Sequence, residues 1–213
     1  MDVTSALGAS CATLEGGVIR VNIIRKAFDA TEVLRDVFFS VDKGETVAIR
    51  GPSGVGKTTL LRLVAGIDTD FDGRIERPEA LAIVFQEPTL LPWRSVLQNI
   101  SLVHPALGDT AVLAALAKVG LDDKADLFPG QLSLGQQRRL SLARAFAARP
   151  DLLILDEPFV SLDAKLADEM LGLTESLIAE FRPATIFVTH AEAEARRLAD
   201  RVLTLGGAPA TLI

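Results

Sequence analysis

The sequence is poor in several residue types, and each shortage narrows the class of protein. Cys11 is the only cysteine among 213 residues, which excludes an internal disulfide framework and indicates a reducing compartment. The chain has no tyrosine and one tryptophan, Trp93. No apolar run approaches the roughly 20 residues of a membrane span, and Asp2 stands where a signal sequence would be basic. We therefore expect a soluble, cytoplasmic chain.

Basic charge is also scarce. The net charge is -6 and the isoelectric point is about 5.0, so a basic surface for non-specific nucleic-acid binding is not expected. Apolar residues make up 49% of the chain and the mean hydropathy is +0.32, which indicates a well-filled core or an additional apolar contact surface. The length suits a single α/β domain.

A glycine-rich stretch has a specific spacing. Residues 51–58, GPSGVGKT, fit the pattern G-x-x-x-x-G-K-[ST] at every fixed position, which predicts binding of a nucleoside triphosphate. We expect its three glycines to adopt positive φ, so that successive backbone N–H groups curl around phosphate oxygens, and the following helix to add its N-terminal amides. The predicted nucleotide-binding residues here are Gly51, Pro52, Ser53, Gly54, Val55, Gly56, Lys57, Thr58 and Thr59.

Two further kinds of group are predicted to serve the same site. Lys57 supplies a positive charge for the β- and γ-phosphates, and the hydroxyl of Thr58 is placed to bind Mg²⁺. Asp156 and Glu157 follow an apolar strand, whose carboxyl end should lie beside the phosphate loop. Neighbouring residues on a strand point to opposite sides, so Asp156 is predicted to hold Mg²⁺ and Glu157 to polarise the attacking water. The alternative is a solvated turn ended by Pro158.

Short apolar runs separated by helical patterns predict an α/β fold with a mainly parallel sheet. Residues 87–150 contain no clear strand but include alanine- and leucine-rich stretches, so we expect a helical insertion there. Residues 1–16 are small and irregular and predict a loose tail. The expected strands are 18–24, 37–41, 46–49, 81–85, 152–155, 185–189 and 201–205, and the clearest expected helices are 59–65, 110–119, 134–148 and 164–181.

Several motifs together resemble an ATP-binding-cassette (ABC) ATPase, over about residues 18–205. Besides the phosphate loop and residues 152–158, these are LSLGQ at 132–136, similar to the LSGGQ signature, Gln86 as in the Q-loop, SLDA at 161–164 as in the D-loop, and His190 as in the switch histidine. The resemblance implies one ABC ATPase domain over 1–213. Its P-loop NTPase (RecA-like) core covers 17–86 and 151–213, with a mixed, mainly parallel sheet and an antiparallel β segment near the N-terminus. A helical subdomain, 87–150, is inserted after the Q-loop.

The resemblance also implies roles for individual residues. His190 would hydrogen-bond the γ-phosphate, and Gln86 would contact Mg²⁺ and the attacking water, so that the catalytic residues are Glu157, His190, Gln86 and Lys57. Phe28 would stack on adenine, unless it is a buried core residue. Neither Asn22 nor Asn99 is followed by lysine, so a guanine-reading N-K-x-D motif is lacking and ATP is favoured over GTP.

The signature stretch predicts a second anion site. Ser133 and Gln136 have the spacing of a capping box that opens a helix, and the resemblance implies that they and Gly135 cover the γ-phosphate bound by a second chain, in a head-to-tail homodimer. Taken alone, the segment could be an ordinary capped helix. Leu134 replaces the first glycine of the family pattern. Asp163 could be a D-loop residue or the N-cap of a helix, and the two roles are compatible.

The motif EPTLLPW at residues 87–93 resembles the corresponding sequence of importer ATPases of the nitrate, sulfonate, taurine and thiamine-precursor group. It implies an ATP-hydrolysing subunit that powers separate transmembrane permease subunits and, through them, serves a solute-binding protein, at the cytoplasmic face of the inner or plasma membrane. Residues 86–99 would form the surface on which the partner subunits dock. Trp93 could instead be a core residue that anchors the helical segment. The alternatives are a non-transport ATPase of the same superfamily and, because of Leu134, a catalytically weak regulatory ATP binder.

Overall fold

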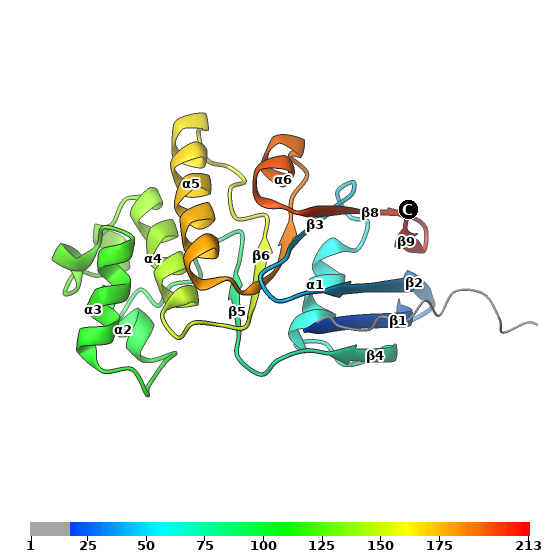
Figure 1. Ribbon diagram of the computed structural model, residues 1–213, viewed down its shortest axis with the longest axis horizontal. Coiled ribbons are helices and arrows are strands. Elements are labelled where there is room, and N and C mark those ends of the chain that lie inside the picture. The colour runs from blue at the N-terminus through cyan, green and yellow to red at the C-terminus, as the bar shows by residue number, and fades with distance from the viewer. Residues whose placement is uncertain (1–17) are drawn as a thin grey trace, which may run out of the picture.

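The computed structural model describes residues 18–213 (Figure 1). The loose tail expected over 1–16 and the single cysteine lie outside the described residues. The strands within 18–213 are β1 (Ile19–Phe28), β2 (Thr31–Val41), β3 (Thr46–Arg50), β4 (Asp72–Glu76), β5 (Leu81–Val84), β6 (Leu152–Asp156), β7 (Ala184–Val188), β8 (Arg201–Gly207) and β9 (Ala210–Leu212). The α-helices there are α1 (Lys57–Ala65), α2 (Val96–Ser101), α3 (Asp109–Lys118), α4 (Leu134–Phe146), α5 (Ala164–Phe181) and α6 (Glu192–Leu198).

The described strands form one mixed sheet, in the order β4-β1-β2-β9-β8-β3-β7-β6-β5. The run β8-β3-β7-β6-β5 is parallel, whereas β1 pairs antiparallel with both β2 and β4. The helices α2, α3 and α4 lie between β5 and β6 in the chain and gather at one end of the molecule (Figure 1). The predicted α/β fold, with its antiparallel N-terminal segment and a helical insertion after β5, is confirmed.

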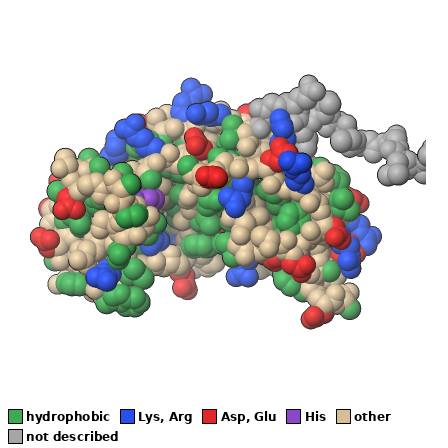
Figure 2. Space-filling model, turned by 90° about the horizontal axis from the view of Figure 1, so that it is seen from below, with side chains coloured by type: hydrophobic (Ala, Val, Ile, Leu, Met, Phe, Trp, Pro, Cys, Tyr) green, Lys and Arg blue, Asp and Glu red, His purple; other side chains and the backbone are tan. Residues whose placement is uncertain are grey.

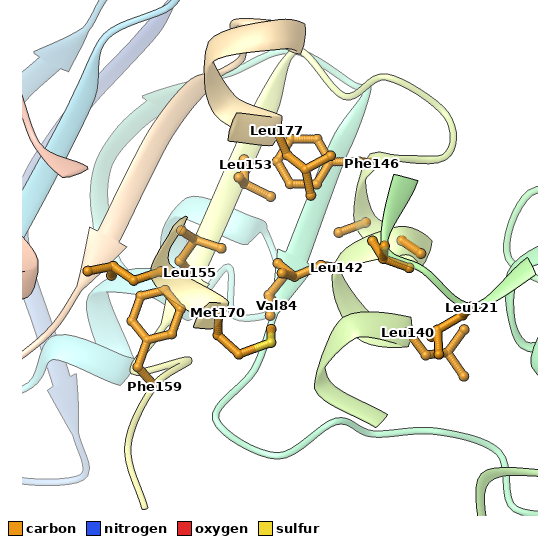
Figure 3. Close-up of a cluster of buried hydrophobic side chains, with 14 of the residues drawn as sticks. Val84, Leu121, Leu140, Leu142, Phe146, Leu153, Leu155, Phe159, Met170 and Leu177 are labelled. Atoms are coloured by element: carbon orange, nitrogen blue, oxygen red, sulfur yellow. The ribbon is translucent and has the colours of Figure 1, made fainter. Parts of the chain in front are cut away.

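The central strands are apolar throughout because both faces of the sheet are covered. In β6, Leu152 and Ile154 join the cluster that packs α1 against the sheet. The intervening Leu153 and Leu155 face the opposite cluster, which contains α4 and α5. Figure 3 shows these two leucines among side chains from both helices. The helix α1, which follows the phosphate loop, and the helix α4 of the insertion therefore pack against opposite faces of β6.

The sequence analysis did not predict two of the strands, β4 and β9. β4 has the sequence DGRIE, lies at the edge of the sheet and pairs only with β1, so it shows no buried apolar run. β9 is three residues long and pairs with β2 and β8. β4 pairs with β1, and β9 pairs with β2, across long sequence separations, which a local pattern does not reveal.

No helix between residues 18 and 213 combines the length and the apolar character needed to cross a bilayer.

Candidate active site

The loop between β3 and α1 owes its shape to glycines that act in two different ways. Gly54 and Gly56 have φ of 78° and 108°, in the left-handed region that favours glycine. Gly51 was expected to share this conformation, and that expectation is wrong. A Cβ at Gly51 would instead lie 2.4 Å from the backbone oxygen of Leu205, so glycine is needed there because β8 approaches closely.

Lys57, the first residue of α1, lies at the centre of this loop. Its side chain is 6% exposed, and Nζ donates to the carbonyl oxygens of Gly51 and Pro52, at 3.0 Å each. Gly56 is the N-cap of α1 and has no side chain to bond the amides of the first turn. Unpaired N-terminal amides beside a fixed ammonium group form a binding place for phosphate oxygens.

Glu157 lies between Lys57 and His190. The carboxylate oxygens are 3.6 Å from Lys57 Nζ and 3.7 Å from His190 Nδ1. The backbone of Glu157 has φ of 46°, and its N–H donates to Val188 at the end of β7. Three predicted catalytic residues thus meet at the carboxyl ends of neighbouring parallel strands, where ligands bind in open α/β sheets.

The three predicted metal ligands also come together. Thr58, Gln86 and Asp156 all line one cavity of about 170 Å³ beside α1. Burial raises the pKa of Asp156, with the charge of Glu157 acting in the same direction and the charges of Lys57 and Arg62 opposing it. One carboxylate with hydroxyl and amide oxygens is a donor set that fits Mg²⁺, which takes few protein ligands when phosphates supply the others.

Phe28 ends β1 with its ring 48% exposed, so it is not the buried core residue that the sequence left as an alternative. Beneath it, the ammonium group of Lys26 lies 4.5 Å from the ring centroid. Lys26 is itself buried, and its Nζ is 2.9 Å from the carboxylate of Asp68 and 2.5 Å from the carbonyl oxygen of Asp70. The exposed ring on a fixed base is a flat apolar platform that suits base stacking.

The signature stretch forms the capped helix start that the spacing predicts. The N–H of Gln136 donates to Ser133 Oγ at 3.3 Å, and the N–H of Ser133 donates to Gln136 Oε1 at 2.9 Å. Leu134 is 48% exposed, whereas a Cβ at Gly135 would lie 2.8 Å from the side chain of Leu166. Asp163 caps α5 through a 3.0 Å bond from the N–H of Leu166.

The described chain brings two groups of predicted residues together beside the phosphate loop. Lys57, Glu157 and His190 are in contact, and Thr58, Gln86 and Asp156 share a cavity beside them. The hydrogen bonds and ion pairs found in residues 18–213 do not join Ser133, Gln136 or Asp163 to Lys57.

The two prolines in residues 86–99 predict a poor helix there. Residues 86–95 are indeed not helical, whereas residues 96–99 belong to α2. Trp93 is 68% exposed, so it is not a core anchor. Hydrophobic side chains are visible on the surface of the helical end of the molecule (Figure 2). The sequence analysis missed Arg138 of α4, which is 6% exposed and donates to the backbone oxygen of Gln86. The one available signal was a charged residue on the inward face of a helix.

The chain is similar to proteins of a known family. The family model described as "ABC transporter" matches residues 34–160. Curated proteins named aliphatic sulfonates import ATP-binding protein SsuB are similar over most of their length. The protein from Frankia alni is 46% identical over 89% of this chain and 77% of its own. The one from a Mycobacterium species is 45% identical over 90% and 81%.

A solved structure is similar as well. The cbiO1 structure from Clostridium perfringens, described as part of the ABC transporter complex cbiONQ, has a TM-score of 0.82 and 28% identity, covering 93% of this chain and 88% of that one.

Proposed function

Because this chain belongs to the ABC transporter family, we propose that it is the ATP-hydrolysing subunit of an importer and powers a separate membrane permease. The observation that carries the proposal is the contact of Glu157 with both Lys57 and His190 at the end of the phosphate loop. The similar proteins are named as import ATP-binding proteins for aliphatic sulfonates. These names and the EPTLLPW motif together favour an aliphatic sulfonate or a similarly small anion as the solute.

The phosphate loop and Lys57 bind the triphosphate of ATP. Backbone N–H groups of residues 53–58 and the N-terminal amides of α1 hold phosphate oxygens, and Lys57 offsets the charge that develops on the γ-phosphate. Thr58, Asp156 and Gln86 would hold Mg²⁺, which supplies further charge neutralisation when bound. The exposed ring of Phe28 stacks on adenine.

Glu157 polarises the attacking water and accepts its proton. The carboxylate is suited to this because Lys57 and His190 restrict its position from two sides. His190, whose side chain is 62% exposed, is free to donate a hydrogen bond to the γ-phosphate. Gln86 orients the water from the end of β5.

Ser133, Gly135, Gln136 and Asp163 act on the nucleotide of a second chain. The capped start of α4 has the form of an anion site, and the hydrogen bonds and ion pairs of the described residues do not join it to Lys57. A head-to-tail homodimer would place the start of α4 from one chain over the nucleotide held by the phosphate loop of the other. Permease subunits, and through them a solute-binding protein, would hold the chain at the cytoplasmic face of the membrane.

Replacing the general base tests the proposed chemistry. Loss of a general base typically lowers a rate by about 10²- to 10⁴-fold, so Glu157→Gln should bind ATP with near-normal affinity but hydrolyse it at least about 100-fold more slowly. Phosphate release and nucleotide binding are measured on the same preparations. Glu180→Gln, at an exposed carboxylate paired with Lys118, is the matched control and should behave like the wild type.

Two outcomes would contradict the proposal. Hydrolysis that persists in Glu157→Gln would remove the assigned base, and a wild-type chain that binds ATP without turnover, even with its permease, would be a regulatory binder. In proteoliposomes that contain the permease and solute-binding protein, an aliphatic sulfonate should stimulate hydrolysis more than an uncharged alkane diol does.

A further inference from the structure

Arg138 is a buried cation in the middle of α4. Its side chain is 6% exposed, and the acceptors that it finds are backbone carbonyl oxygens. Its Nε is buried and has no hydrogen-bond partner among the described residues. Burying a guanidinium group is unfavourable unless its donors are satisfied, so the position calls for a reason beyond packing.

The acceptors of Arg138 belong to two separate loops. Nη1 donates to the carbonyl oxygen of Gln86 and, at 3.2 Å, to that of Pro158. Nη2 lies 3.5 Å from the carbonyl oxygen of Val160. The first loop carries the side chain of Gln86, and the second begins immediately after Glu157. One planar group therefore spans the backbones that carry two proposed catalytic side chains.

Neighbouring side chains of α4 brace only the first of these loops. Ser141 Oγ donates to the carbonyl oxygen of Pro88 at 2.8 Å. Arg144 donates to the carbonyl oxygens of Pro88 and Thr89 at 3.0 and 2.9 Å. These bonds tie residues 88–89 to α4 but do not reach residues 157–160. Of the three side chains, Arg138 alone connects the helix to both loops.

We propose that Arg138 is a positioning residue for ATP hydrolysis, which fixes the backbone of Gln86 relative to that of Glu157. The inference rests on the proposed function, because it assigns those two side chains to the attacking water. A displacement of about 1 Å between catalytic groups can cost about 10²-fold in rate. The guanidinium group suits the task because its donors have a rigid planar spacing, which a single ammonium group does not reproduce.

The decisive variant is Arg138→Lys, which keeps the charge and the aliphatic stem. Its ammonium group should bond one loop and leave the other untied, so we expect kcat to fall by about 10- to 100-fold while KM for ATP and the midpoint of thermal unfolding stay close to wild-type values. Arg139→Lys is the matched control on the same helix, because Arg139 is more exposed and contacts Val119 and Glu169 instead.

A second measurement needs neither nucleotide nor turnover. Amide hydrogen exchange should accelerate together at residues 86–89 and 157–160 in Arg138→Lys, and remain unchanged at those residues in Arg139→Lys. Arg138→Met, which removes the charge but retains much of the stem, should give the same pattern as Arg138→Lys. A buried charge with a purely structural role would instead lower the unfolding midpoint in proportion to the lost activity.

The outcomes separate this inference from the proposed function. If hydrolysis depends on Glu157 and Arg138→Lys matches Arg139→Lys in kcat, the function stands and the inference is wrong. A loss of kcat fully explained by unfolding also overturns it. If the wild-type chain shows no Glu157-dependent hydrolysis, the proposed function fails, and unchanged exchange in Arg138→Lys would then remove the link between the loops as well.

Discussion

At the scale of single residues, the most informative positions are charges inside the fold. Lys26 is buried beneath Phe28 and pairs with Asp68, whose side chain is 21% exposed. The hydrogen bond from Lys26, together with one from the backbone N–H of Asp70, lowers the pKa of Asp68. The proposed adenine platform therefore depends on an ion pair that joins β1 to the loop after α1.

Asp68→Asn should destabilise the chain in a pH-dependent way. Because the pKa of Asp68 is lowered in the folded state, its stabilising effect is present above the ordinary aspartate pKa of about 3.9 and is lost as the pH falls through the folded-state value. The variant should unfold at lower urea concentration than the wild type at pH 7, and the difference should begin to shrink only near pH 4 and vanish below the folded-state pKa of Asp68. Asp70→Asn, at a carboxylate that is 96% exposed, should show a smaller difference at every pH.

At the residue scale, the sequence predicts positions that depend on local spacing. The arrangement of Lys57 beside the loop glycines follows from consecutive residues, and Glu157 follows from its place after β6. Arg138 and Lys26 were missed because their acceptors lie on other segments. Gln86 is 52 residues from Arg138, and Asp68 is 42 residues from Lys26. Only the folded chain shows that these charges are satisfied.

At the scale of elements, α4 has two faces with different tasks. Leu140 is fully buried in the cluster shown in Figure 3, whereas Leu134 is 48% exposed at the first turn. The orientation of Leu134 leaves it free to face another molecule, and it adds little to the packing of its own chain.

Truncation of the two leucines should separate these faces. Leu140→Ala removes buried methyl groups and should lower the free energy of unfolding by about 2–5 kcal/mol. Leu134→Ala should lower it by less than about 1 kcal/mol, because the side chain is half exposed. Urea titrations followed by circular dichroism measure both. A loss at Leu134 as large as that at Leu140 would mean that Leu134 is a core residue after all.

The elements that sequence reasoning found are those whose own residues carry a regular pattern of apolar positions. β3, β6 and β7 are buried on both faces and therefore read as continuous apolar runs. The 18-residue helix α5 was predicted at its observed bounds. Asp163 is its N-cap, which is one of the two roles that the sequence predicts for this residue. β4 and β9 were missed because pairing with neighbouring strands, and not their own composition, makes them strands.

At the scale of the whole molecule, the hydrogen bonds and ion pairs of residues 18–213 do not join the capped start of α4 to the phosphate loop of the same chain. ATP should therefore join two chains. In the presence of ATP and Mg²⁺, we expect size-exclusion chromatography with light scattering to give Glu157→Gln twice the 22.7 kDa mass of the monomer. The reason is that ATP bound between the chains is not consumed in this variant. Lys57→Ala should remain monomeric under the same conditions. A Glu157→Gln chain that binds ATP and stays monomeric would argue against the head-to-tail dimer.

Trp93 gives the molecule a built-in optical reporter. It is the only tryptophan, the chain has no tyrosine, and the indole is 68% exposed on the segment that links β5 to α2. Nearly all intrinsic ultraviolet emission of the protein therefore arises at one surface position, seven residues after Gln86. A permease that covers this segment would shift the emission to shorter wavelength, so docking is readable without attaching a dye.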